Sequence, residues 1–351
     1  MTRNMYSFST GVLLIVFSLV LFGCSSSGKD SDKEIKSITL KVSNYYAATA
    51  PFSEKAVQPW MDRVTELTDG KVEFDYFPGG QLGDGDEQFE LVRDGVADIG
   101  FTNATYEPDD WALTAMLSSM PITDNNATKG SKAFLKLIEE DDSAIVENDF
   151  LENDVRPLFG AVSPPVEIFT INKEIRVPSD LKDVKIRTAG GVEAEALNYL
   201  EAVPTSIPFG DVYESVERGI IDATTVHTVA LRTAGVDQLI DNRLGISFSN
   251  FILPLFINES VWQSLPDETK DAMEQASREI AISQAESQEA ETTEVEGLFE
   301  EEGMVTPKLK DDETQQWKEF NEEFQNYWLK KNSSDEIPYK DTLDTYKSYI
   351  Q

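Results

Sequence analysis

Residues 71–101 read KVEFDYFPGGQLGDGDEQFELVRDGVADIGF, and this stretch decides the fold class. Its first part, 71–77, alternates apolar and polar side chains as a half-buried strand does, and a Pro-Gly-Gly break follows at 78–80. Residues 86–94 then predict a helix that a glycine ends, and 96–101 predict a short buried strand. A strand, a helix and a strand in direct succession favour an α/β fold with a parallel sheet.

The same pattern continues on both sides of this stretch. Residues 37–43 alternate like a strand, and 51–67 place apolar side chains at helical spacing. A second α/β unit begins near residue 162. Its predicted elements are strands at 167–170, 184–187 and 220–224 and a helix at 193–200. Segments 94–98 and 218–222 each place an aspartate three residues after a glycine at a strand start, which indicates two similar lobes.

The C-terminal part of the chain predicts two helices. Pro266 and Asp267 begin a helix that can run through Glu301, which is longer than one lobe needs. Residues 311–331 predict a last helix with an aromatic face that packs onto a lobe. The aromatic residues of that face are Trp317, Phe320, Phe324 and Trp328.

The first 23 residues predict a lipoprotein signal peptide. An apolar run from Gly11 to Phe22 is too short for a stable membrane anchor, and it ends at Gly23 and Cys24. Cys24 is the only cysteine of the chain and precedes a polar stretch, which resembles a bacterial lipobox whose cysteine is acylated. With the cysteine acylated, residues 24–36 would form a flexible tether. The alternative is an ordinary secretory signal.

Composition excludes several functional classes. The formal net charge is −34, from 64 acidic and 30 basic residues, which argues against nucleic acid as a partner. One histidine in 351 residues leaves no ligand set for a catalytic zinc ion, and we predict no metal and no cofactor. Neither a Gly-x-Ser-x-Gly elbow nor a Walker or dinucleotide motif is present, so we expect no enzymatic turnover.

Six motifs follow one another in the order found in a known family. They are Gly-Lys-Val at 70–72, Phe-Pro-Gly-Gly-Gln-Leu-Gly at 77–83, Asp-Gly-Val-Ala-Asp at 94–98, Val-Pro-Ser-Asp-Leu-Lys-Asp-Val-Lys-Ile-Arg at 177–187, Phe-Gly-Asp-Val-Tyr at 209–213 and Ser-Val-Trp-Gln-Ser-Leu-Pro at 260–266. In this order and spacing the chain resembles the solute-binding subunits of TRAP transporters, the DctP-type family.

The resemblance implies a fold, a partner and a location. The fold would be a two-lobed, periplasmic-binding-protein-like α/β structure with a ligand cleft between the lobes and a long helix that spans both. We expect 37–161 with about 247–288 to form lobe I, and 162–246 with about 289–351 to form lobe II. With the lipid anchor expected at Cys24, the protein would act outside the cytoplasm and deliver a small carboxylate to membrane permease subunits driven by an ion gradient.

The resemblance also implies ligand-binding residues. In this family the arginine that ends the Lys-Ile-Arg strand grips the ligand carboxylate, and here it is Arg187; its guanidinium is a planar fork of donors that matches a carboxylate. The alternative is an arginine in a surface ion pair. Further positions that touch ligand in the family are Tyr45, Tyr46, Asn103 and Phe209. The aromatic residues could equally pack in the core, and Asn103 could cap a turn.

Two departures from the family bear on the ligand. Glu167 stands where several members carry a second arginine, and a carboxylate there would repel a dianion. In segment 222–227, Thr225 and His227 replace more polar groups. Together these positions favour a monocarboxylate, or a zwitterion whose cation faces Glu167. The alternatives are a solvent-facing Glu167 and a structural His227.

Two other functions remain open on the sequence alone. A binding protein of an ATP-driven importer shares the two-lobed plan but lacks the long helix and the ordered motifs. A surface-anchored enzyme or adhesin would carry a catalytic constellation or repeats, and neither is visible.

Overall fold

The computed structural model describes residues 37–123 and 125–351. The predicted signal peptide at 1–23, the tether at 24–36 and the predicted acylation site Cys24 lie outside the described residues. Within the described part of the chain, every helix is too short or too polar to cross a lipid bilayer.

The first half of the molecule is built on a mixed five-stranded sheet in the order β2-β1-β3-β10-β4. Its strands are β1 (Ile38–Asn44), β2 (Val72–Phe77), β3 (Ile99–Phe101), β4 (Val155–Val162) and β10 (Ile252–Asn258). β1 pairs in parallel with β2 and β3, whereas β10 is antiparallel to β3 and β4. The predicted parallel pairing is confirmed for β1, β2 and β3, whereas β10 returns from the other half and runs in the opposite direction, which makes the sheet mixed.

The second half repeats this plan in the order β7-β6-β8-β5-β9. Its strands are β5 (Val166–Thr170), β6 (Lys185–Thr188), β7 (Val203–Ser206), β8 (Ala223–His227) and β9 (Asn242–Arg243). β6 is parallel to β7 and β8, and β5 is the strand that arrives from the first half, antiparallel to β8 and β9. The chain thus passes between the two sheets twice, from β4 to β5 and from β9 to β10.

The expected similarity of the two lobes is confirmed at the glycine turns. Gly95 and Gly219 both have positive φ, at 74° and 66°, which glycine adopts without strain. Three residues later, Asp98 donates its backbone N–H to Lys41 of β1, and Asp222 donates its N–H to Lys185 of β6. The same turn therefore attaches β3 to β1 in the first lobe and β8 to β6 in the second.

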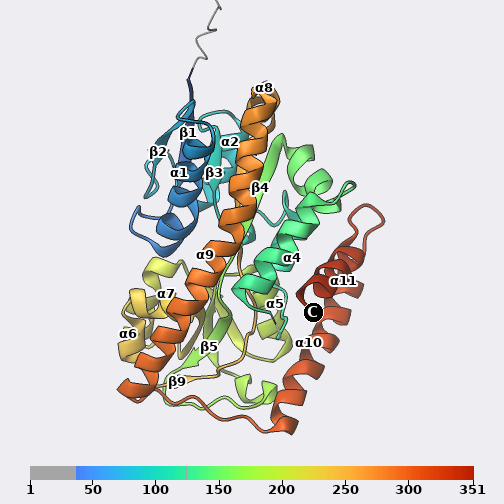
Figure 1. The fold of residues 1–351 in the computed structure, drawn as a ribbon. Helices are drawn as coiled ribbons and strands as arrows, with labels where there is room; N and C mark the ends of the chain where they lie inside the picture. Colours follow the sequence, from blue (N-terminus) through green and yellow to red (C-terminus); the bar gives the residue numbers. More distant parts are fainter. Residues whose placement is uncertain (1–36, 124) are drawn as a thin grey trace, which may run out of the picture. The chain divides into compact units, whose positions relative to one another are not determined.

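The helices cover both sheets. Their bounds are α1 (Gln58–Leu67), α2 (Gln88–Arg93), α3 (Ala112–Ser119), α4 (Ala127–Glu139), α5 (Gly191–Tyr199), α6 (Val212–Glu217), α7 (Thr228–Thr233), α8 (Glu259–Ser264), α9 (Asp267–Glu302), α10 (Asp311–Lys331) and α11 (Tyr339–Ile350). The predicted long helix is confirmed as α9, which packs on α1 and α4 in the first lobe and on α7 in the second. Figure 1 shows α9 running past both lobes.

The C-terminal helices contact both lobes. The predicted helix at 311–331 is α10, and its aromatic face is buried. The Trp317 indole N–H donates to the Arg176 carbonyl at 2.9 Å, whereas the Gln325 side chain donates to the Pro121 carbonyl at 2.7 Å. The sequence did not predict α11, which packs on α4. The lobe boundaries given above stay a prediction.

Two short chain segments join the lobes side by side. Residues 163–165 connect β4 to β5, and residues 244–251 connect β9 to β10. Ser163 donates its backbone N–H to the Phe251 carbonyl at 2.8 Å, and its hydroxyl accepts from the Phe251 N–H at 2.9 Å. Asn250 adds a side-chain bond to the Ser163 carbonyl at 3.0 Å. We call these paired segments the crossing.

Candidate functional site

A cavity of about 370 Å3 receives residues from both lobes. It lies near the carboxyl ends of parallel strands, where loops leave the sheet and where α/β folds bind ligands. Its side chains from the first lobe and the crossing include Tyr45, Tyr46, Phe52, Asn103, Tyr106, Phe251 and Leu253. Those from the second lobe include Arg187, Phe209, Val226, His227, Ala230 and Thr233. Most of this lining is apolar or aromatic.

Arg187 is held in place by backbone carbonyls, and its remaining donors have no partner within residues 37–123 and 125–351. It ends the Lys-Ile-Arg run of β6 and is 4% exposed. Its Nε donates to the Ile207 carbonyl at 2.9 Å and its Nη1 to the Thr225 carbonyl at 3.0 Å. Among the residues that the structure describes, no acidic side chain forms an ion pair with it. Burial lowers the pKa of Arg187, yet the group remains charged at neutral pH. The guanidinium can therefore donate hydrogen bonds to a ligand carboxylate.

Aromatic rings form much of the cavity wall. Tyr45 and Tyr46 follow β1, with ring centroids 4.0 Å apart, and Tyr106 meets Tyr45 edge-on at 6.0 Å. Burial raises the pKa of each of these three phenols, so they are neutral and can donate a hydrogen bond. Phe209 lies with its ring centroid 5.9 Å from the Arg187 guanidinium carbon. The wall suits a flat, apolar ligand body.

Phe52 and His227 meet across the lobes. Their ring centroids are 6.2 Å apart in an edge-on arrangement. Phe52 directly precedes the π-helical turn Ser53–Val57, an irregularity that is frequent at functional sites. His227 caps α7, because its Nδ1 accepts the Ala230 N–H at 3.3 Å. Burial lowers the pKa of His227 to about 4, so the ring is neutral and its Nε2–H is the donor left for a ligand.

Asn103 adds one amide group to the cavity. Its Oδ1 accepts the Thr105 N–H at 3.0 Å, which caps the short helical turn Ala104–Tyr106. Within the described part of the chain its Nδ2 finds no acceptor. Asn103 therefore caps a turn, as one reading of its sequence position predicted, and it also lines the cavity; its contact with a ligand stays a prediction.

The comparison with known families identifies the chain. Residues 43–332 match the model of the bacterial extracellular solute-binding proteins of family 7, the DctP family. The chain belongs to this family of TRAP solute-binding subunits. As a family member it acts outside the cytoplasm, and the family is one of binding proteins.

Individual relatives are distant but cover nearly the whole chain. The outer membrane transporter protein TsaT of Comamonas testosteroni is 23% identical over 318 residues, 88% of this chain and 91% of the relative. A TRAP solute-binding protein from a marine metagenome, solved with 3-hydroxybenzoate, aligns with a TM-score of 0.78 at 21% identity, covering 90% of this chain and 98% of that chain. A homologue from Bordetella bronchiseptica with bound mandelate aligns at 0.76 and 21% identity, over 89% and 98%.

Glu167 does not line the cavity of this TRAP solute-binding protein, which corrects the expectation that it faces the ligand. Both of its carboxylate oxygens accept from Arg243 of β9, at 2.6 and 2.8 Å, and one also accepts the Gly245 N–H at 3.2 Å. Arg243 is bonded to Glu296 of α9 as well. Burial raises the pKa of Glu167, and Arg243 opposes that shift. Glu167 therefore ties β5 to β9 and α9.

Thr225 is the second predicted contact that lies outside the cavity wall. Its side chain is fully buried and its hydroxyl donates to Glu193. Its carbonyl holds the Arg187 Nη1. In β8 the cavity-lining neighbours are Val226 and His227, and Thr225 points to the other side of the strand from Val226. Thr225 therefore supports the arginine from behind.

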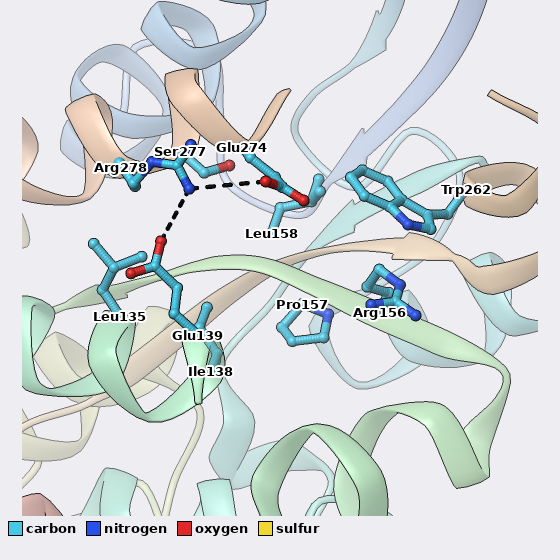
Figure 2. A pocket seen from close by; sticks show the side chains of 10 residues that line it. All are labelled: Leu135, Ile138, Glu139, Arg156, Pro157, Leu158, Trp262, Glu274, Ser277 and Arg278. Carbon is cyan, nitrogen blue, oxygen red and sulfur yellow. Dashed lines mark hydrogen bonds and ion pairs between the residues drawn. The ribbon is translucent and has the colours of Figure 1, made fainter. Parts of the chain in front are cut away.

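A larger cavity of about 540 Å3 lies elsewhere in the TRAP subunit, among α4, β4, α8 and α9 (Figure 2). Its charges are already paired with each other. Arg278 bonds to Glu139 at 3.1 Å and also faces Glu274, and Arg156 makes a bidentate pair with Glu259. A charged ligand here would have to compete with these pairs, so the cavity at Arg187 is the better candidate for a carboxylate.

Sequence reasoning missed several lining residues of the subunit. Tyr106 could have been found, because it follows the third strand as Asn103 does. For Phe52 the only indication in the sequence is its place at the start of the helix that follows the first strand, and this is weaker than the indication for Tyr106. Phe251 and Leu253 belong to the crossing and to β10, and no local pattern indicated that this segment enters the site.

Proposed function

We propose that this protein captures a small monocarboxylate with an apolar body of about the size of an aromatic ring and delivers it to a TRAP permease. The observation that carries the proposal is Arg187, a buried arginine without an acidic partner among the described residues, in a cavity lined mostly by aromatic and aliphatic groups. Arg187 would bind the carboxylate, and the tyrosines, Phe52 and Phe209 would enclose the body.

The charge of the cavity favours one carboxylate over two. Arg187 is the only charged side chain among the described residues of the lining. A second carboxylate would be buried without a cationic partner, which costs several kcal/mol. The cationic group of a zwitterion would find no carboxylate at Glu167, because Glu167 forms an ion pair with Arg243. Neutral donors on His227, Asn103 and the tyrosines suit a hydroxyl or keto group on the ligand.

The relatives support this ligand class. Homologous structures hold 3-hydroxybenzoate, benzoate and mandelate, and a curated relative from Nostoc binds monocarboxylate 2-oxoacids. Other relatives of the same fold are solved with glucuronate and galacturonate, so the fold alone does not select the ligand. The aromatic lining of this chain makes the aromatic acids the better match.

Delivery would follow closure of the two lobes. An open form admits the solute, and the closed form with the carboxylate on Arg187 is recognised by the permease. The sequence around Cys24 supports a lipid anchor that keeps the protein at the membrane. Metabolic labelling with an alkyne fatty acid tests the anchor: the wild type should be labelled and the Cys24→Ser variant should not.

The ligand class is tested on the full-length Cys24→Ser protein. Thermal shift and calorimetry would compare benzoate, 3-hydroxybenzoate, mandelate, pyruvate, succinate, glucuronate and proline. We expect an aromatic monocarboxylate to stabilise the protein by about 3 kcal/mol at a hundredfold excess over its Kd, and mass spectrometry to recover it unchanged. Arg187→Gln should weaken binding about a hundredfold or more.

The matched control is Arg156→Gln in the larger cavity, which should leave binding unchanged. If succinate binds best, the argument for one carboxylate is wrong. If no carboxylate binds, or if Arg187→Gln binds like the wild type, the proposed role of the cavity is wrong.

A further inference from the structure

Glu193 is a fully buried carboxylate in the first turn of α5. Hydroxyl groups from separate segments donate to it. Thr188 of β6 and Thr225 of β8 both donate to its Oε1, and Ser249 donates to its Oε2 at 2.7 Å. Three donors from separate segments hold a buried carboxylate in one orientation.

Two of these donors belong to the strands that hold Arg187. Thr188 directly follows Arg187 in β6. The Thr225 carbonyl accepts from the Arg187 Nη1 at 3.0 Å, and the Thr225 hydroxyl lies 3.2 Å from the Arg187 carbonyl. The negative charge of Glu193 also acts on the arginine, since it favours the protonated guanidinium. The orientation of Arg187 thus depends on the strands that Glu193 joins.

The third donor belongs to the crossing between the lobes. Ser249 bridges to Val166 at the start of β5 and lies beside Asn250 and Phe251, which bond to Ser163 of the other connecting segment. Phe251 also lines the ligand cavity. Ser249 therefore lies where closure of the lobes must bend the chain.

We propose that Glu193 is a positioning residue that couples Arg187 to the crossing, so that the state of the lobes and the orientation of the arginine change together. The chain of bonds runs from Arg187 through Thr225 and Glu193 to Ser249. A movement of the crossing displaces the carboxylate, and the carboxylate displaces the strand carbonyl that holds the guanidinium. Ligand binding at Arg187 acts on the crossing by the same path.

This inference rests on the proposed function only where ligand affinity is concerned. Its first measurement needs no ligand. Two spin labels, attached through the substitutions Asp62→Cys and Lys173→Cys at exposed positions of the two lobes in the full-length Cys24→Ser protein, report the distribution of distances between the lobes. The second measurement is the Kd of 3-hydroxybenzoate.

The variants separate coupling from plain stability. Ser249→Ala removes the bond to the crossing and leaves the bonds to β6 and β8, and Glu193→Gln removes the charge. Ser277→Ala is the control for the first, because among the described residues its buried hydroxyl accepts only the Trp60 N–H, at 3.0 Å. Asp149→Asn is the control for the second, because this buried carboxylate accepts donors from Leu113 and Thr114 in the first lobe.

We expect Ser249→Ala and Glu193→Gln to shift or broaden the distribution of distances between the lobes in the ligand-free protein. Both variants should raise the Kd of 3-hydroxybenzoate about tenfold. Both controls should lower the Tm but leave distance and Kd unchanged. The coupling is overturned if Ser249→Ala behaves like the control Ser277→Ala, with a lower Tm but an unchanged distribution of distances. If the wild type does not bind 3-hydroxybenzoate, the ligand class is in question, and the distance distribution alone decides on the coupling.

Discussion

At the scale of single residues, the hydrogen-bond partners of a buried charged side chain decide whether it can bind a ligand. Arg187 donates to two backbone carbonyls, and its other N–H groups can donate to a ligand. Arg243 instead donates to the carboxylates of Glu167 and Glu296. Both arginines are nearly buried in the same lobe. The difference between a binding residue and a structural one therefore lies in whether a carboxylate of the chain already occupies the guanidinium.

Removal of Glu167 tests its structural role. Glu167→Ala leaves Arg243 buried with fewer partners, so we expect the free energy of unfolding to fall by about 3 kcal/mol in urea titrations. The affinity for a cavity ligand should stay within about twofold. Glu259→Ala, which breaks the half-buried pair with Arg156, should cost about 1 kcal/mol or less. A large loss of ligand affinity in Glu167→Ala would restore a role for this residue at the site.

His227 predicts a pH dependence of stability. Burial lowers its pKa to about 4, whereas in the unfolded chain the pKa is about 6.5. Below about pH 6.5 the unfolded chain is therefore protonated at this histidine while the folded chain is still neutral. Stability from the neutral ring is present above that pH and is lost as the pH falls towards 4. His227→Asn keeps a side-chain oxygen for the helix cap and removes the titration.

We expect the ligand-free wild type to lose about 2 kcal/mol relative to His227→Asn between pH 7 and pH 4.5. Urea titrations at both pH values measure this difference, and other acidic groups cancel in the comparison. Parallel pH curves for the two proteins would show that His227 is not neutral by burial.

At the scale of elements, the start of α5 brings together the groups that the site depends on. Gly190 and Gly191 have positive φ, at 109° and 61°, and they let the chain turn from the Arg187 strand into the helix that carries Glu193. A Cβ on Gly191 would lie 3.1 Å from the Ser119 hydroxyl of α3. Both the backbone and the close approach therefore require glycine there.

Two glycine substitutions test this requirement. Gly191→Ala should lower the free energy of unfolding by about 1 kcal/mol or more, because alanine is strained at positive φ and presses on Ser119. Gly297→Ala is the matched case in the exposed part of α9, where a Cβ meets nothing within 4 Å. It should stabilise the protein by about 0.5–1 kcal/mol. Equal effects of the two substitutions in urea titrations would contradict this account.

At the scale of the whole molecule, charge acts against compactness. The chain carries a formal charge of −34, and the exposed acidic residues repel one another over distances that salt controls. The ion pairs of the surface, such as Arg63 with Glu279, compensate only part of this charge. The folded chain should therefore be more stable where counterions are abundant.

We expect the Tm to rise by several degrees between about 20 mM and 300 mM sodium chloride, because the Debye length falls from about 20 Å to about 6 Å. Differential scanning calorimetry without ligand measures the change. Sucrose at equal osmolality serves as the control, since it raises the Tm without screening charge. A Tm that is independent of salt would show that repulsion is not a significant part of the stability.

The sequence by itself determined the features that neighbouring residues encode. Alternation and helical spacing predicted β1, β2, α9 and α10 close to their observed bounds, and the ordered motifs pointed to Arg187 as the residue at the strand end. These features depend on side chains only a few positions apart, so the periodicity of the sequence predicts them well.

Only the tertiary structure decided which side chains share the cavity. Glu167 turns to Arg243, which is 76 residues away, and β10 enters the first sheet after the chain has passed through the second lobe. Phe52 and His227 meet from different lobes, and Ser249 reaches Glu193 from the crossing. The period of a strand tells which residues share a face, but the partner on that face comes from a distant segment, so packing alone decides it.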